Sequence, residues 1–356
     1  METAILSKFP PGSRLISETP HGNSKWAKPT IEPTLLTVIL PDESRHKYFL
    51  KRTSSAEGRE MTEGEYESMS EIYKLAPNFV PKPHSWGICH SVDGEEIHFF
   101  IQEFIEMTTH ILPDPEKLCR KLSSLHKASV PGKNFGFHVQ TSQGRTLQAV
   151  NTKFPTWTPF FTHILKHITE VDMSVNGHWV SLATLESRIF THVIPRLIGI
   201  LEEKGREIKP CLIHGDLWEG IIGTVVSTGD IVVFDATSYY AHHEMEVANW
   251  RCHYNKIHDE RYTRTYLKYY QPSEPREEWE DRNRMYCIYY NILYSVNDMD
   301  QGMAVRQTNV LLFYLLSTTC IILLISTPPF PTGEGPPRLI EAERVGLSAV
   351  RDHTKV

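Results

Sequence analysis

The stretch IHGDLWEGIIG, residues 213–223, places an acid directly after His-Gly, where a short apolar run ends in a turn. The run CLI precedes it, so we expect a strand to lead into the turn that carries Asp216. A second stretch of the same kind, GDIVVFDATS at 229–238, leads from an apolar strand into Asp235. Two short strands that each end in an acid predict that Asp216 and Asp235 lie at a shared edge.

The N-terminal third of the chain is predicted to be rich in β-structure. TLLTVIL and KYFLK, joined by the turn PDES, indicate a hairpin between residues 34 and 51. The segment REMTEGEYESMSEIYKLAP then spaces Met61, Met69 and Ile72 on one helical face and ends at a proline. EIHFFIQEFI, at 96–105, is typical of a buried strand. This pattern predicts a small β-rich lobe with one inserted helix.

The character of the sequence changes to helical after residue 106. DPEKLCRKLSSLHKAS has a proline near its first turn and places Leu118, Leu122 and Leu125 on one face. SLATLESRIFTHVIPRLIGILEEKG, at 181–205, predicts another long amphipathic helix. We therefore expect an α+β protein with a two-lobed architecture: a small lobe at 1–106, a larger, mostly helical lobe at 107–309, and a segment at 310–356 of separate status.

Composition excludes several classes of protein. The 356 residues suffice for two lobes with their own cores, and 40% of them are hydrophobic, as in ordinary globular proteins. The formal net charge of −6 argues against nucleic acid as a partner. The six cysteines are scattered without a CxxC pair, which favours reduced thiols, and the N-terminus lacks the apolar core of a signal peptide. The expected location is cytoplasmic.

Several residues match the needs of phosphoryl transfer. Such a site requires a carboxylate that orients the acceptor hydroxyl, a carboxylate on Mg²⁺ and a lysine on the nucleotide phosphates. Lys51 ends the strand YFLK, and Glu65 on the following helix is placed to hold it by an ion pair. Taken singly, each has a structural alternative: Lys51 as a solvated edge charge, and Glu65 as part of the polar face of its helix.

The order of strand lysine, helix glutamate, helical lobe, HGDLW and strand aspartate resembles the fructosamine/ketosamine kinase family. That family lies within the aminoglycoside-phosphotransferase-like group, which has a protein-kinase-like fold. The residues that carry the resemblance are FLK at 49–51, EGE at 63–65, VPKPHSWG at 80–87, LHK at 125–127, WTPFF at 157–161, HGDLWEG at 214–220 and FDATSYYAHHEMEVA at 234–248.

The resemblance implies a kinase that uses ATP and Mg²⁺ to phosphorylate the 3-hydroxyl of a ketosamine, on glycated proteins or on small amines. In that family the sugar phosphate is unstable and falls away, so the net result is deglycation. It also points to ribulosamine and psicosamine, rather than fructosamine, as the sugars. A kinase of another small hydroxylated acceptor is the alternative.

Roles for individual residues follow from the resemblance. Asp216 would be the catalytic base, and His214 would brace its loop through backbone bonds. Asp235 would bind the metal, with a helix cap as its structural alternative. Glu103, Phe104 and Ile105 match the linker whose main chain bonds adenine.

Three further residues are candidates for contact with the acceptor. Trp218 is expected either to line the sugar site or to pack in the core. His242 and Glu244 are expected to contact the substrate or to order a loop. A zinc site at His242, His243 and Glu244 is disfavoured, because adjacent histidines point in different directions on a strand or a helix.

Two positions depart from the family pattern. Where the motif has an asparagine that helps to hold Mg²⁺, this chain has Ile221, whose alkyl side chain offers no lone pair. Reduced turnover, or a binding module without catalysis, is the consequence to test; Ile222 is expected to return to the core. The turn expected to cover the nucleotide, ETPHGNSKW at 18–26, contains only Gly22.

Residues 310–326, VLLFYLLSTTCIILLIS, carry no charge and precede the proline-rich TPPFPTGEGPP. The run is shorter than the ~20 residues that usually span a bilayer. Three interpretations stay open: a buried terminal helix, a tail unrelated to the kinase fold, and a membrane anchor.

Overall fold

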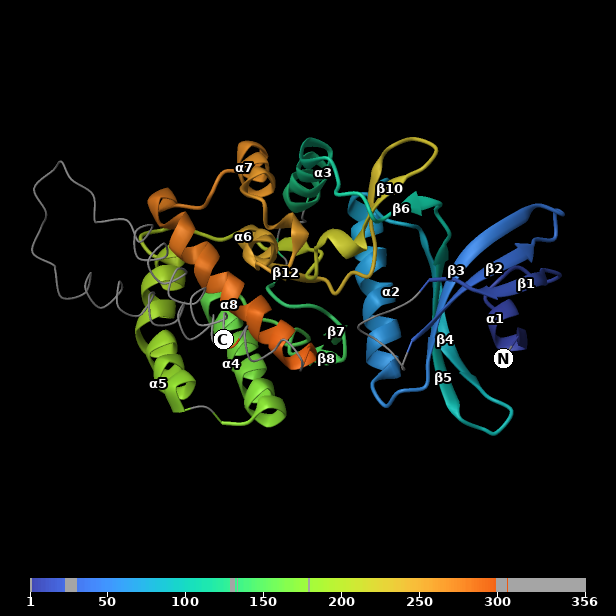
Figure 1. Cartoon of the computed structure of the whole chain (residues 1–356), viewed down its shortest axis with the longest axis horizontal. Helices are drawn as coiled ribbons and strands as arrows, with labels where there is room; N and C mark the ends of the chain where they lie inside the picture. The colour runs from blue at the N-terminus through green and yellow to red at the C-terminus, as the bar shows by residue number, and fades with distance from the viewer. Residues whose placement is uncertain are drawn as a thin grey trace, which may run out of the picture.

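The computed structural model describes residues 2–22, 31–128, 132, 134–178, 180–298 and 306. It shows an α+β fold in which a β-sheet lobe stands beside a mostly helical lobe (Figure 1). This architecture confirms the predicted fold class.

The sheet of the first lobe is antiparallel throughout. Its five strands, in spatial order, are β1 (Arg14–Pro20), β2 (Glu32–Ile39), β3 (Arg45–Thr53), β5 (Glu96–Glu103) and β4 (Pro83–His90). The expected hairpin is the β2 and β3 pair, whose register runs from Glu32 opposite Arg52 to Ile39 opposite Arg45. The short helix α1 (Glu2–Leu6) covers a small core of this lobe, to which Ile5, Phe9, Leu36, Val38 and Leu50 contribute.

Helix α2 (Gly58–Leu75) is the inserted helix of the first lobe, and it lies between the sheet and the second lobe (Figure 1). Met61, Met69 and Ile72 are buried, as their spacing predicted. Met69 and Ile72 belong to the larger core that continues into the second lobe. The helix therefore fixes the position of Glu65 relative to both lobes.

The second lobe is built from six α-helices within the described residues. They are α3 (Pro115–Lys127), α4 (Trp157–Asn176), α5 (Val180–Arg188), α6 (His243–Ala248), α7 (Glu260–Tyr269) and α8 (Trp279–Asn297). The α3 helix begins where the sequence predicts, because Asp114 caps it by accepting a hydrogen bond from the amide of Lys117 at 2.8 Å. Its apolar face of Leu118, Leu122 and Leu125 is buried.

The prediction of one long α-helix at 181–205 is wrong. Only α5 is regular, and the chain continues through wider π-helical turns at Ile189–Ile198 and a 3₁₀ turn at Gly199–Glu202. Pro195 lies inside the π-helical part. Its ring carries no N–H and clashes with the preceding turn, so regular α-helical bonding cannot pass through it.

The strands that precede the two acids do not share a sheet edge, in contrast to the expectation. β9 (Cys211–Ile213) pairs with β12 (Tyr239–Ala241), whereas β11 (Ile231–Val233) pairs with β10 (Ile222–Val225), which pairs with β6 (Met107–Thr108). The two turns are brought together after the strands end, where the amide of Thr237 donates to the carbonyl of His214 at 2.9 Å. A separate hairpin, β7 (Thr141–Gln143) and β8 (Thr146–Gln148), lies beyond them.

Arg306 is tied to the second lobe after α8 ends. It is buried and pairs with Asp172 of α4 at 3.0 Å, and it donates to the carbonyls of Asn176 and Gly177. The apolar run 310–326 lies outside the described residues, and the predicted lobe boundaries stay predictions. Among the described residues, none of the helices combines the length and the apolar character needed to cross a membrane.

Candidate active site

Lys51 joins the two lobes at the centre of the site. Its Nζ lies 2.7 Å from Oε1 of Glu65 on α2 and 2.5 Å from Oδ1 of Asp235, which follows β11. Lys51 and Glu65 are almost completely shielded from solvent, whereas the side chain of Asp235 is 41% exposed. Three residues predicted separately from sequence are thus in direct contact.

The charges around Lys51 keep it a cation. Burial alone would lower the pKa of its ammonium group, but the carboxylates of Asp235 and Glu65 outweigh burial and raise that pKa above its ordinary value. Asp235 itself has a φ of +59°, in the left-handed region that is uncommon for residues other than glycine. It is followed by no helix, so the cap suggested as its structural alternative is absent. A fixed cation therefore faces a carboxylate held in an unusual backbone conformation.

Asp216 lies on the turn after β9, and its carboxylate accepts a hydrogen bond from Nε2 of Gln143 at 2.5 Å. Burial raises the pKa of Asp216 well above its usual range, and the negative charge of Asp235 raises it further. The hydrogen bond from Gln143 opposes that rise. The two acids are thus close enough to influence each other, as the sequence predicted, although they come from different sheets.

The loop that carries Asp216 is anchored from below by Glu246 of α6. The backbone amides of His214 and Gly215 both donate to its carboxylate, the second at 3.1 Å. Glu246 is fully buried. The ring of His214 bonds the carbonyl of Phe234 at 3.0 Å, which is the backbone bonding expected of a bracing residue.

The sequence analysis did not single out Glu246, although it named Glu244 two residues earlier. The available signal was position: a second acid two residues later on the same short helix. The structure assigns the contact with the Asp216 loop to Glu246.

The side chain of Trp218 leaves room only for a glycine at position 220. The indole ring lies across Gly220, where an added Cβ would stand only 2.2 Å from the ring. Trp218 is half-buried, so part of it faces solvent. Packing on Gly220 is therefore an observed role, and contact with a sugar stays a prediction.

The backbone of Ile221 is hydrogen-bonded to the residue that precedes Asp235. Its carbonyl accepts a hydrogen bond from Phe234 at 3.1 Å, one residue before the acid. The side chain is only 4% exposed, but unlike Ile222 it does not join the main core. The departure from the family motif thus falls next to the acid expected to bind metal, while Ile222 packs inside as predicted.

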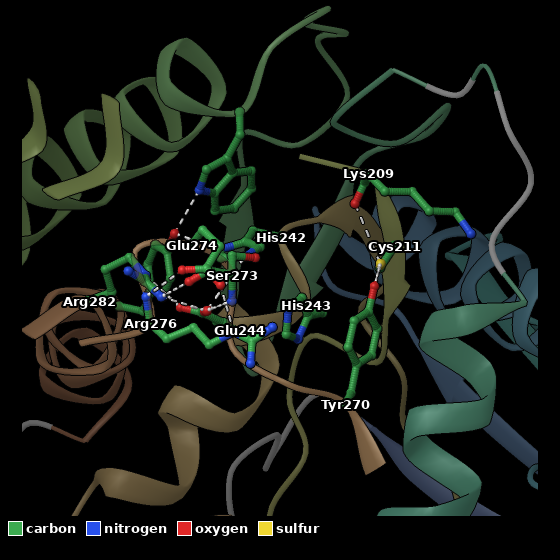
Figure 2. Close-up of polar contacts among 12 residues, drawn as sticks. Lys209, Cys211, His242, His243, Glu244, Tyr270, Ser273, Glu274, Arg276 and Arg282 are labelled. Carbon is green, nitrogen blue, oxygen red and sulfur yellow. Dashed lines mark hydrogen bonds and ion pairs between the residues drawn. The ribbon is translucent and has the colours of Figure 1, made fainter. Parts of the chain in front are cut away.

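His242 and Glu244 lie in a network of polar contacts that includes Ser273 and Arg282 (Figure 2). Both are buried. His242 bonds Tyr286 through Nδ1 at 2.9 Å and Ser273 through Nε2 at 2.8 Å, and Glu244 forms a two-bond ion pair with Arg282 at 2.8 and 2.9 Å. These contacts and the burial of both side chains favour the loop-ordering interpretation, and contact with the substrate stays an untested prediction.

The side chains of His242, His243 and Glu244 do not diverge, in contrast to the expectation for adjacent histidines. The donor atoms of His242, His243 and Glu244 lie within 4.8 Å of one another, because the chain turns at the start of α6. The donor atoms nevertheless have other partners: Nδ1 of His243 bonds Tyr266 at 3.0 Å, and Arg282 neutralises Glu244. A cation there would meet a buried guanidinium, so these contacts favour a hydrogen-bonded network over a metal site.

The predicted adenine linker begins at the end of β5. The amide of Glu103 donates to the carbonyl of Lys82 at 2.8 Å and that of Phe104 to the carbonyl of Lys47 at 3.2 Å, while the amide of Lys82 donates to the Glu103 carboxylate. In the described part of the chain, the amide of Ile105 makes no backbone hydrogen bond. A main-chain donor at this position suits the edge of a purine base.

Asp235 is the residue that fits a magnesium ion. Mg²⁺ usually binds through one or two carboxylates, substrate phosphates and several waters. The carboxylate of Asp235 is partly exposed, and Ile221, at the position of the family's asparagine, has no side-chain oxygen. The protein part of the donor set is therefore small but of the right chemistry.

Comparisons with known proteins identify the family to which this chain is similar. The model of the fructosamine kinase family matches residues 21–316. The protein-ribulosamine 3-kinase, chloroplastic, of Oryza sativa subsp. japonica is 29% identical over 244 residues, which cover 68% of this chain and 65% of the rice protein. The chain therefore spans slightly less than two thirds of that relative's length. The ketosamine-3-kinase of Mus musculus is 30% identical over 58% of this chain and 70% of the mouse protein.

Solved structures share the fold. A fructosamine-3-kinase candidate from Thermobifida fusca has a TM-score of 0.65 at 18% identity, and the match covers 89% of this chain and 98% of the other. Aminoglycoside phosphotransferases are among the other structures that match.

Proposed function

Because this chain belongs to the fructosamine kinase family, we propose that it is an ATP-dependent kinase that phosphorylates the 3-hydroxyl of a ketosamine. The observation that carries the proposal is the contact of Lys51 with both Glu65 and Asp235, with Asp216 on the adjoining turn. A lysine held by a helix glutamate is the arrangement by which kinases position nucleotide phosphates.

Asp216 would orient the acceptor. The 3-oxygen forms a bond to the γ-phosphorus while the bond from that phosphorus to the β–γ bridging oxygen breaks, and ADP leaves with the electron pair. The hydroxyl proton passes to the carboxylate of Asp216. Its raised pKa suits this role, because a carboxylate with a higher pKa is a stronger base.

Lys51 and Asp235 would hold the nucleotide. The ammonium group of Lys51 binds phosphate oxygens, and Glu65 keeps it in place when Asp235 turns to its own ligand. Asp235 would hold Mg²⁺, which neutralises charge on the phosphates when bound. The carbonyl of Glu103 and the amide of Ile105 would form hydrogen bonds with the edge of the adenine, so these two linker residues would act through their main chain.

The acceptor sugar is proposed to be ribulosamine or psicosamine, on glycated proteins or small amines, so that loss of the unstable phosphate amounts to deglycation. The rice relative is named a protein-ribulosamine 3-kinase, which supports the choice. It is also named as chloroplastic, so the cytoplasmic location of this chain stays a prediction.

Turnover of ribulosyl-lysine tests the proposal. Purified protein is incubated with ATP, Mg²⁺ and ribulosyl-lysine, and the sugar phosphate is followed by phosphorus NMR beside the Asp216→Asn variant. We expect a sugar phosphate signal from the native chain and none from the variant. Equal spectra from both proteins would reject the proposed activity, and a panel of other small hydroxylated acceptors would then identify a different kinase.

A second candidate function is nucleotide binding with little turnover. Ile221 favours it, because its alkyl side chain offers a metal no oxygen where the family motif has an asparagine. Thermal stabilisation by Mg²⁺ and ATP without product formation from any acceptor would support this second function over the first.

A further inference from the structure

Gln143 contacts the candidate catalytic acid, although it lies far from it in the sequence. It ends strand β7, and its Nε2 donates to Oδ1 of Asp216 at 2.5 Å. A carboxylate only accepts hydrogen bonds, so the nitrogen of the amide must face Asp216. The amide oxygen, Oε1, must then point elsewhere.

The Oε1 atom of Gln143 is buried and has no hydrogen-bond partner within the described residues. Buried polar atoms of native proteins are almost always bonded, so an exception next to a reacting group calls for a ligand. The free atom is a lone-pair acceptor, and it belongs to the same planar amide that holds the catalytic carboxylate. Its missing partner is therefore a donor that arrives with the acceptor molecule.

The hairpin that carries Gln143 is fixed before any ligand binds. Asn297, at the end of α8, accepts from the amide of Arg145 at 3.0 Å and from the hydroxyl of Thr146 at 3.2 Å, and it donates to the carbonyl of Gln143 at 3.2 Å. Gly144, at the tip, has a φ of +58° and comes so close to Asn297 that a Cβ would stand 2.8 Å from its oxygen. The backbone that carries the Gln143 side chain is thus held in place by α8.

We infer that Oε1 of Gln143 accepts a hydrogen bond from a hydroxyl of the acceptor that is vicinal to the phosphorylated one. This inference rests on the proposed function. The planar amide of Gln143 would act at both ends. Its Nε2 bonds Asp216, which faces the reacting hydroxyl, and its Oε1 faces the neighbouring hydroxyl. In a ketosamine the neighbours of the 3-hydroxyl are the 2-keto oxygen and the 4-hydroxyl. Only the 4-hydroxyl carries a proton in the open-chain sugar, so Gln143 selects a 3,4-diol.

The test pairs variants with acceptors. The native chain, Gln143→Met and Gln143→Asn are assayed with ribulosyl-lysine and with its 4-deoxy analogue. Met keeps the volume but has no amide, and Asn keeps the amide but withdraws it by one methylene. Gln140→Met is the matched control, because the side chain of Gln140 makes no hydrogen bond in the described structure. Thermal unfolding identifies any variant that fails to fold.

We expect the native chain and Gln140→Met to prefer ribulosyl-lysine over the 4-deoxy analogue by about 10-fold or more in kcat/KM. Both Gln143 variants should lose that preference, whatever their absolute rates, because loss of the bond to Asp216 affects both acceptors alike. A preference that survives in the Gln143 variants overturns the inference and leaves the proposed function standing. If the native chain phosphorylates neither acceptor, both fall together.

Discussion

Lys51 and Asp235 form an ion pair of 2.5 Å that joins the sheet of the first lobe to the second lobe. Under the proposed function, a bound nucleotide would replace both ends of this pair, with phosphate oxygens on Lys51 and a metal on Asp235. Glu65, which lies 2.7 Å from Lys51, would keep its contact with the ammonium group. In the structure the charges of Lys51 and Asp235 therefore compensate each other, and the two side chains already lie next to each other.

Replacing Lys51 with methionine should abolish most turnover while the protein still folds. The change removes a preorganised cation from the phosphates, a kind of loss that typically lowers rates by about 10²–10³. Steady-state kinetics with varied ATP would measure it. Lys74→Met serves as the control, because Lys74 is exposed on the same helix as Glu65 and pairs only at the surface. Equal loss in both variants would argue against a phosphate role for Lys51.

Asp216→Asn should raise the thermal stability of the protein, and the gain should grow with pH. The folded-state pKa of Asp216 lies above its ordinary value because of burial and Asp235. Below about pH 4 the acid is protonated in both states and contributes nothing. As pH rises, the unfolded state ionises first, so the native protein loses stability until the folded-state pKa is passed. Asparagine cannot ionise, and it escapes this loss.

Thermal unfolding in metal-free buffer at pH 4 and pH 8 checks the sign. We expect near-equal Tm values at pH 4 and a Tm for the variant about 1–3 °C higher at pH 8. A gain confined to the acid side would mean that the pKa of Asp216 is lowered rather than raised in the folded protein.

Local patterns predicted the residues that a short motif carries. Lys51 lies near the end of β3, Glu65 lies on α2, and Asp216 and Asp235 lie on the turns that follow β9 and β11. Hydrophobic spacing in the sequence locates all of these elements. The π-helical turns around Pro195 were missed, because the apolar spacing continues through them and hides the break.

Contacts between distant segments could not be predicted in the same way. Gln143 reaches Asp216 from a hairpin, and Glu246 reaches the amides of His214 and Gly215 from a helix. The residues that flank Gln143 and Glu246 in the sequence do not indicate which distant group each side chain contacts. The same limit applies to His242 and Glu244, whose partners Tyr286 and Arg282 lie on α8.

Glu246→Gln should destabilise the protein and slow catalysis together. The carboxylate accepts from two backbone amides, whereas the amide of glutamine turns one N–H group towards another. An unsatisfied buried donor costs about 1–3 kcal/mol. Chemical unfolding and kcat measured on the same preparation would test the link. Glu260→Gln, which loses only an exposed pair with Arg264, should change neither quantity.

Ile221→Asn should increase turnover and lower the concentration of Mg²⁺ needed for half-maximal rate. The new side chain would place an oxygen beside Asp235, where the family motif has one, and a restored polar group of this kind is worth up to about 10²–10³ in rate. Ile222→Asn is the matched control, because Ile222 belongs to the main core and its replacement should destabilise the protein without any gain. Kinetics over a range of Mg²⁺ concentrations separate the two variants. If Ile221→Asn folds and gains nothing, the isoleucine does not limit the reaction, and Asp235 with substrate phosphates and water suffices for the metal.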